Sequence, residues 1–201
     1  RRQLLPLLFA LAAACTSADF AEDADGNSTN RLADLAPGWN MIRPGGETTC
    51  AQSTEFAFFV RAASTDKLLV YLQGGGACWD AATCDPQGEP TYSRDVDERD
   101  NPAGRPTGIF ALENPANPLR DHSMVMIPYC TGDVHLGDTI TTYTVQQEGA
   151  DSRDVTVHHR GYVNVMAALD WVARNFDEPR QIVVAGSSAG SIPSPFYADV
   201  L

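Results

Sequence analysis

The strongest constraint on the fold is an apolar run that breaks into a Gly-x-Ser-x-Gly pattern near the end of the chain. It occupies residues 181–190 and reads QIVVAGSSAG. The uncharged residues 182–184 are typical of a strand buried on both faces. Glycines flank the central serine where a sharp strand-to-helix turn leaves no room for Cβ atoms, so the pattern predicts a nucleophile elbow with Ser188 as the nucleophile. The alternative is a turn that merely connects two elements.

Two prolines follow the elbow. Pro193 and Pro195 stand where the next helix should gain its first hydrogen bonds. Proline has no backbone N–H to donate, so we expect this helix to begin irregularly.

The other end of the chain has the features of an export signal. Arg1 and Arg2 precede an apolar run of about ten residues that is too short to span a bilayer. Cys15 follows two alanines and is a candidate for lipidation; ordinary cleavage after the alanines is the alternative. We expect a signal peptide at 1–15, an acidic disordered leader at 16–34 and a folded domain at 35–201.

Composition fits an exported globular enzyme. The hydrophobic fraction is 43%, which is ordinary for a folded domain, and the net charge is −12. An acidic chain is a poor partner for nucleic acid or for anionic lipid, so we expect membrane contact only through a lipid anchor. The predicted location is secreted, periplasmic or, as a lipoprotein, on the outer surface. The sequence indicates no oligomeric state.

Cysteine spacing predicts two disulfides. If Cys15 belongs to the signal or carries lipid, four cysteines remain for an oxidising compartment. Cys78 and Cys84 are close enough for a local bridge, which leaves Cys50 with Cys130. A zinc site is the alternative, but the chain has no Cys-x-x-Cys pair and no histidine beside these cysteines in sequence.

A triple glycine follows the strongest early strand. Residues 39–42, 55–61 and 67–72 are predicted strands, and the last runs into the sequence QGGGACW at 73–79. Serine esterases place their oxyanion hole after such a strand, because glycine lets the substrate approach backbone N–H groups. We therefore expect Gly75, Gly76 and Ala189 to donate these hydrogen bonds. A flexible turn is the alternative. A phosphate-binding loop is not expected, because the lysine of its Gly-x-x-x-x-Gly-Lys pattern is absent.

The middle of the chain alternates loops with regular elements. Residues 85–120 are predicted to form a long surface excursion, either part of the substrate site or plain surface. Residues 123–128 form a predicted buried strand, and His135 and Asp138 after it are candidates to line the site, although a structural role in the loop is the stronger interpretation. A polar hairpin at 139–157 precedes a helix at 162–176, with Val163, Met166, Leu169 and Trp171 facing the core.

Four motifs in this order resemble the pectin acetylesterase and Notum family. They are LQGGGACW at 72–79, PYCTGD at 128–133 with Gly137–Asp138, Arg160–Gly161, and GSSAG at 186–190. The resemblance implies a secreted esterase of the α/β-hydrolase fold, with a mostly parallel sheet and no metal or cofactor. It implies that Ser188 is the nucleophile and that Gly75, Gly76 and Ala189 form the oxyanion hole. Trp79 is a further candidate for lining the site. The family often has Trp where this chain has Gly76 or Ala77, which changes the expected wall of the acyl pocket.

The order of the catalytic triad limits the interpretation. In this fold the order is Ser, Asp, His, yet all four histidines precede Ser188, and Asp199 is expected on the elbow's own helix. We therefore expect a fragment, truncated after the elbow, whose triad Asp and His lie beyond residue 201. Without the histidine, Ser188 should be nearly inert.

Three functions remain open from the sequence. The first is a serine esterase that removes acetyl groups from a polysaccharide such as pectin. The second is a complete hydrolase with the order His, Asp, Ser, for example with His135 and Asp154. The third is a non-catalytic carbohydrate-binding or cell-surface scaffold.

Overall fold

The structure, a computed structural model, describes residues 31–146, 149 and 151–201. The expected signal peptide, Cys15 and most of the expected leader lie outside the described residues. Within the described ranges, every helix is too short or too polar to cross a membrane.

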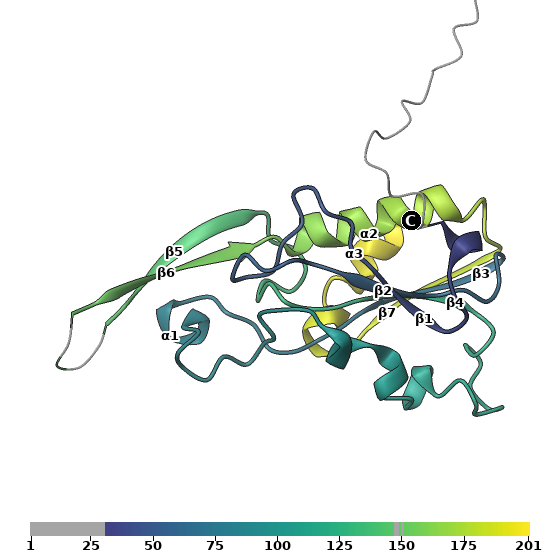
Figure 1. Cartoon of the computed structure of the whole chain (residues 1–201), viewed down its shortest axis with the longest axis horizontal. Coiled ribbons are helices and arrows are strands. Elements are labelled where there is room, and N and C mark those ends of the chain that lie inside the picture. Colours follow the sequence, from purple (N-terminus) through teal and green to yellow (C-terminus); the bar gives the residue numbers. More distant parts are fainter. Residues whose placement is uncertain (1–30, 147–148, 150) are drawn as a thin grey trace, which may run out of the picture.

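A five-stranded mixed sheet forms the centre of the molecule (Figure 1). The strand order is β1-β2-β4-β3-β7, with bounds β1 Trp39–Ile42, β2 Phe58–Arg61, β3 Lys67–Leu72, β4 Ser123–Ile127 and β7 Gln181–Gly186. Only β2 runs against the others: it pairs antiparallel with β1 and β4, while β3 pairs parallel with β4 and β7. The sheet is therefore mostly parallel, as the sequence predicts.

The strands at 39–42 and 67–72 have the predicted bounds, but β7 differs from the prediction in its burial. Ile182 is 37% exposed, and the burial of Val183 and Val184 is only partial. The expectation that this strand is buried on both faces is wrong for the described residues. The reason is that β7 is the last strand in the order, with β3 as its one described partner.

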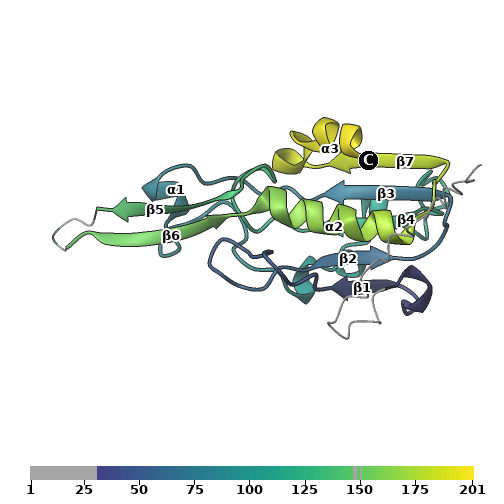
Figure 2. The ribbon, with the colours of Figure 1, turned by 90° about the horizontal axis from the view of Figure 1, so that it is seen from above.

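One face of the sheet is covered by α2 (Gly161–Asn175), and α3 (Ser194–Val200) lies on the same side beside β7 (Figures 1 and 2). Trp171 on α2 packs edge-on against Phe58 on β2, with ring centroids 5.9 Å apart. The predicted core face of α2 is partly wrong, because Val163 is only half-buried. Of the other predicted residues, Leu169 and Trp171 are buried in the core and Met166 packs against it. Val165, Ala168 and Val172 complete the buried face.

The excursion at 85–120 covers the opposite face of the sheet (Figure 1). It contains the 3-10 helices η2 (Glu98–Asp100), η3 (Pro102–Gly104) and η4 (Gly108–Phe110), and it follows the short helix α1 (Ala81–Cys84). Phe110 packs edge-on against Trp39 and Tyr71, with ring centroids 5.7 and 5.0 Å apart. These aromatic contacts hold an excursion of otherwise irregular backbone on the sheet.

The described residues just before the predicted boundary at residue 35 already pack on the domain. A 3-10 helix, η1, covers Leu32–Asp34. The N–H of Leu32 donates to Asn175 Oδ1 at 2.7 Å, and Leu32 and Leu35 pack against the core. The last residues of the expected leader are thus part of the folded unit.

A two-stranded hairpin projects from the carboxyl end of the sheet (Figure 2). Its strands are β5 (Thr139–Val145) and β6 (Arg153–His159), paired antiparallel, in the region where the sequence predicts a hairpin. The buried side chains of β6 pack with Ala51, Tyr92, Tyr129 and Ala189 in a second apolar cluster.

Two disulfides join the loops at this end of the sheet, and they are the two pairs that the sequence favours. Cys50–Cys130 links segments 80 residues apart, and Cys78–Cys84 closes a short loop with a separation of 6. Both pairs fit a protein of an oxidising compartment.

Candidate active site

The turn after β7 has the geometry of a nucleophile elbow. β7 ends at Gly186, and the 3-10 helix η5 (Ser188–Ser191) begins at once. Ser188 is exposed and has a φ of +47°, a left-handed conformation that costs a serine free energy. Gly186 and Gly190 pack so closely that a Cβ on Gly186 would overlap the carbonyl of Gly190. The surrounding backbone therefore holds the turn in this strained shape.

The glycine loop, residues 73–78, lies directly against this elbow. The N–H of Gly74 donates to Ser187 Oγ at 3.2 Å, and a Cβ on Gly74 would come within 2.9 Å of Ser188 Cβ. Gly75 and Gly76 have φ values of +151° and +71°. Among the described residues, the N–H groups of Gly75 and Gly76 have no acceptor, and that of Ala189 has none outside its own 3-10 helix η5. Backbone N–H groups without an acceptor are the kind of donor that an oxyanion hole requires.

Side chains that the sequence analysis missed hold the glycine loop. Gln73 accepts from Tyr129 N at 3.0 Å through Oε1 and donates to Asp100 Oδ1 at 3.3 Å through Nε2. Thr91 Oγ1 lies 3.3 Å from both the N and the O of Ala77, and it fills the space that a Cβ on Gly76 would need. The position of Gln73 directly before the triple glycine was a usable signal; nothing in the sequence singles out Thr91.

The three residues proposed to line the site lie in different environments. Trp79 is 69% exposed at the surface after the glycine loop. Asp138 forms an exposed ion pair with Arg160 at 2.5 Å. His135 is 1% exposed, and its Nε2 lies 2.8 Å from Gln73 O. Because a carbonyl oxygen can only accept a hydrogen bond, Nε2 of the ring donates to it. Burial lowers the pKa of His135.

None of the four histidines in the chain hydrogen-bonds to Ser188. His135 binds Gln73, His158 lies 2.8 Å from Ser53 Oγ, and His159 lies 3.0 Å from Thr131 O and from Tyr143 OH. His122 is buried, and neither of its ring nitrogens has a described partner.

The alternative order His, Asp, Ser is wrong for the pair considered. Asp154 lies on β6 and accepts from Thr144 Oγ1 at 2.8 Å, whereas the His135 ring donates to Gln73. Asp199 is an exposed residue of α3, as the sequence suggests. No general base for Ser188 has therefore been found among the described residues.

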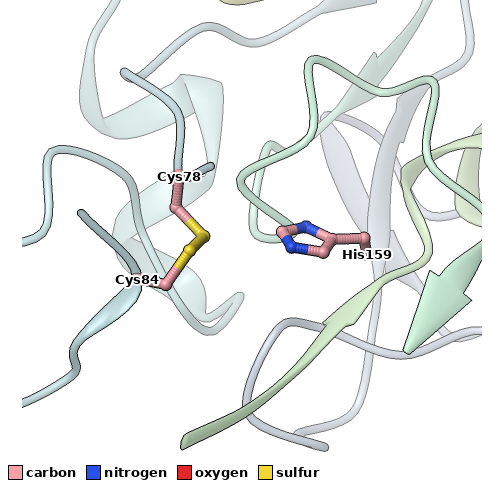
Figure 3. Close-up of side chains that lie close together, drawn as sticks. All are labelled: Cys78, Cys84 and His159. Atoms are coloured by element: carbon pink, nitrogen blue, oxygen red, sulfur yellow. A yellow bond between two sulfur atoms is a disulfide. The ribbon is translucent and has the colours of Figure 1, made fainter. Parts of the chain in front are cut away.

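A cluster of two cysteines and a histidine has the residue types of a metal site (Figure 3). Three possible ligand atoms lie within 4.8 Å of one another: the two sulfur atoms of Cys78 and Cys84 and a ring nitrogen of His159. A histidine therefore lies beside these cysteines in space, although none is their neighbour in the sequence. The two sulfur atoms are bonded to each other, and both nitrogens of His159 have protein partners. The cluster is a disulfide packed against a hydrogen-bonded histidine.

A polar pocket of about 640 Å³ adjoins the glycine loop. Its lining includes Gln73, Tyr92, Arg94, Asp100 and Arg105. Polar and charged side chains predominate, so the pocket suits a hydroxyl-bearing ligand better than a hydrocarbon chain.

The mostly parallel sheet and the turn after β7 are those of the α/β-hydrolase fold. A crystal structure of the Wnt deacylase Notum from Drosophila aligns with a TM-score of 0.51 at 20% identity, covering 76% of this chain and 44% of that one. The pectinacetylesterase family model matches residues 43–201. The chain therefore belongs to the pectinacetylesterase family.

Curated relatives include vertebrate Notum proteins. Palmitoleoyl-protein carboxylesterase notum2 of Xenopus laevis is 27% identical over 146 residues, or 71% of this chain. Human palmitoleoyl-protein carboxylesterase NOTUM is 26% identical over 145 residues. This chain spans only 28% and 27% of their lengths. Inactive palmitoleoyl-protein carboxylesterase notum1b of Danio rerio is 28% identical over 112 residues, and there the match covers 81% of the relative.

Proposed function

We propose that the protein is a serine carboxylic-ester hydrolase with Ser188 as its nucleophile. The observation that carries the proposal is the left-handed Ser188 at a strand-to-helix turn, beside a glycine loop with unused N–H groups. Membership of the pectinacetylesterase family supports the same class of reaction.

The proposed reaction has two steps. Ser188 Oγ attacks the ester carbonyl carbon, and the alcohol leaves with a proton as the acyl-enzyme forms. Water then attacks the acyl-enzyme, which releases the acid and restores the serine. The N–H groups of Gly75, Gly76 and Ala189 hold the oxygen that gains negative charge in each step.

The base for this reaction is proposed to lie beyond residue 201, together with the aspartate that orients it. The contacts of the four histidines in this chain support that placement. Three of them, His135, His158 and His159, bind groups other than Ser188, and the ring of His122 has no described partner. No metal or cofactor is required for this mechanism.

The proposed substrate is an acetyl ester on a polysaccharide such as pectin. The family description supports an acetyl group, and the polar pocket beside Gln73 supports a sugar portion. The relatives named palmitoleoyl-protein carboxylesterases make a longer acyl group the competing substrate. The proposed location remains outside the cytosol, either secreted, periplasmic or held by lipid at Cys15.

The test compares two chains, this 201-residue protein and one lengthened by the residues encoded after the Leu201 codon. Acetate release from acetylated pectin and hydrolysis of 4-nitrophenyl acetate are measured for each. We expect activity in the longer chain, its loss in Ser188→Ala, and full activity in Ser152→Ala, a control serine in the exposed hairpin. Acetate release that survives Ser188→Ala would overturn the proposal.

A non-catalytic scaffold is the second candidate. Two observations favour it: the absence of a base for Ser188 among the described residues, and the match to a relative whose name calls it inactive. A stop codon directly after Leu201 and binding of deacetylated pectin without acetate release would support this alternative.

A further inference from the structure

Four residues connect the nucleophile elbow to the glycine loop and back through a closed series of contacts, which we call the clasp: Ser187, Gln73, His135 and Tyr197. Ser187 Oγ accepts from the N–H of Gly74, so the peptide between Gln73 and Gly74 is held at its nitrogen. The carbonyl of the same peptide accepts from His135 Nε2 at 2.8 Å. One peptide of the glycine loop is thus fixed at both of its polar atoms.

The clasp closes through the helix that follows the elbow. Tyr197 on α3 is 0% exposed, and its hydroxyl donates to the carbonyl oxygen of His135 at 2.5 Å. Ser187 and Tyr197 both belong to the segment that carries Ser188. The glycine loop is therefore linked to the elbow on one side directly and on the other side through His135.

His135 is itself held rigidly in this position. Its φ is +59°, its N–H donates to Asp133 Oδ1 at 3.2 Å, and its ring packs on Tyr129 with centroids 4.8 Å apart. A Cβ on Gly161 would come within 2.7 Å of His135 Cα, so α2 begins against its backbone. A residue held in a rare conformation by so many contacts suits a precise positioning role.

We propose that His135 is a positioning residue. By holding the Gln73–Gly74 peptide, it fixes the position of the glycine loop relative to Ser188, and the hydrogen bond from Tyr197 in turn holds His135 in place. This inference rests on the proposed function. Oxyanion stabilisation depends on donors that are in place before charge develops, so a loop that shifts by a few tenths of an ångström weakens the transition state more than substrate binding. Neither side chain touches the substrate in this account.

The first experiment needs no activity and uses the 201-residue chain. Amide hydrogen exchange of Gly74 is followed in wild type, His135→Leu and Tyr197→Phe. We expect exchange at Gly74 to accelerate about tenfold in both variants, because the peptide loses a restraint. Tyr143→Phe is the matched control, because it also removes a hydroxyl that lies within hydrogen-bond distance of a histidine, His159, but on the hairpin strands β5 and β6. Unchanged exchange in folded Tyr197→Phe would overturn the inference.

The second experiment uses the longer chain and separates positioning from general damage. His135→Leu and Tyr197→Phe should lower kcat about ten- to a hundredfold with KM within about twofold, since donors are lost only for the transition state. His135→Gln, whose amide can still donate to Gln73 O, should recover most of kcat. Variants that change KM alone, or a failed rescue in a folded protein, would contradict the role. An inactive wild type would refute the proposed function, while hydrogen exchange would still decide the clasp.

Discussion

Asp133 accepts a hydrogen bond of 2.7 Å through Oδ2 from the N–H of Gly161, the first residue of α2. Its other oxygen accepts from Thr131 Oγ1 at 2.6 Å and from His135 N at 3.2 Å. A Cβ on Gly161 would overlap this carboxylate, as would one on Gly137. Two motifs that lie far apart in sequence, TGD at 131–133 and Arg160–Gly161, are thus one structural unit that anchors α2 to the loop after β4.

Asp133→Asn should therefore lower the free energy of unfolding by about 1–3 kcal/mol. The amide can replace neither the charge at the start of a helix nor all three accepted hydrogen bonds. Urea unfolding measures the change. Asp138→Asn, in the same loop but in an exposed ion pair, is the control and should have a clearly smaller effect. Equal effects of the two variants would contradict the account.

Gly190→Ala should destabilise the elbow strongly. The added Cβ would overlap Leu72 O and lie 2.7 Å from Gln73 O, and backbone atoms at the end of β3 cannot move away easily. We expect a loss of about 2–3 kcal/mol or more in the free energy of unfolding. Gly104→Ala is the matched control, because nothing lies within 4 Å of the Cβ that it adds. Its effect on the free energy of unfolding should stay within about 0.5 kcal/mol. A tolerated Gly190→Ala would show that the turn is looser than described.

The two disulfides should differ in their contribution to stability. A bridge across 80 residues restricts the unfolded chain more than one across 6, so the chain-entropy estimate is about 4.5 kcal/mol for Cys50–Cys130 and about 2 kcal/mol for Cys78–Cys84. Paired alanine replacements of each bridge, compared by denaturant unfolding, test the order. A larger loss from removing Cys78–Cys84 would contradict it.

Stability should fall in mildly acidic solution because of buried histidines. Burial, with Lys67 nearby, lowers the pKa of His122, and burial also lowers that of His135. Each therefore stabilises the fold fully above its unfolded pKa of about 6.5 and less as the pH falls below that value. His122→Phe should remove part of the loss of unfolding free energy between pH 8 and pH 5. Parallel stability curves for wild type and variant would contradict this.

Local sequence patterns predicted the elements but not the contacts between them. The apolar runs at 39–42 and 67–72 are bounded by polar or turn residues, and their strands match β1 and β3. Pro193 and Pro195 correctly predicted an irregular start to α3, which begins only after the 3-10 helix η5. The prediction that Val163 is buried was wrong, because helical periodicity alone does not fix which of two adjacent rows of residues on the helix meets the sheet.

The candidate site was predicted only where a motif marks it. Glycine patterns located Ser188 and the glycine loop, because left-handed or crowded backbone requires that residue type. The supporting contacts of Thr91 and Tyr197 depend on tertiary packing and carry no local signal. For His135 the sequence favoured a structural role in its loop over lining the site, but the group that its ring binds, the carbonyl of Gln73, became visible only in the structure.

The most direct test of the central claim is covalent labelling with a fluorophosphonate, which reacts with an activated serine. The longer chain is labelled, digested and analysed by mass spectrometry, with Ser188→Ala and Ser152→Ala beside it. The account predicts a single label on Ser188, lost in Ser188→Ala and retained in Ser152→Ala. A label on another serine, or equal labelling of Ser188→Ala, would contradict the assignment of Ser188 as the nucleophile.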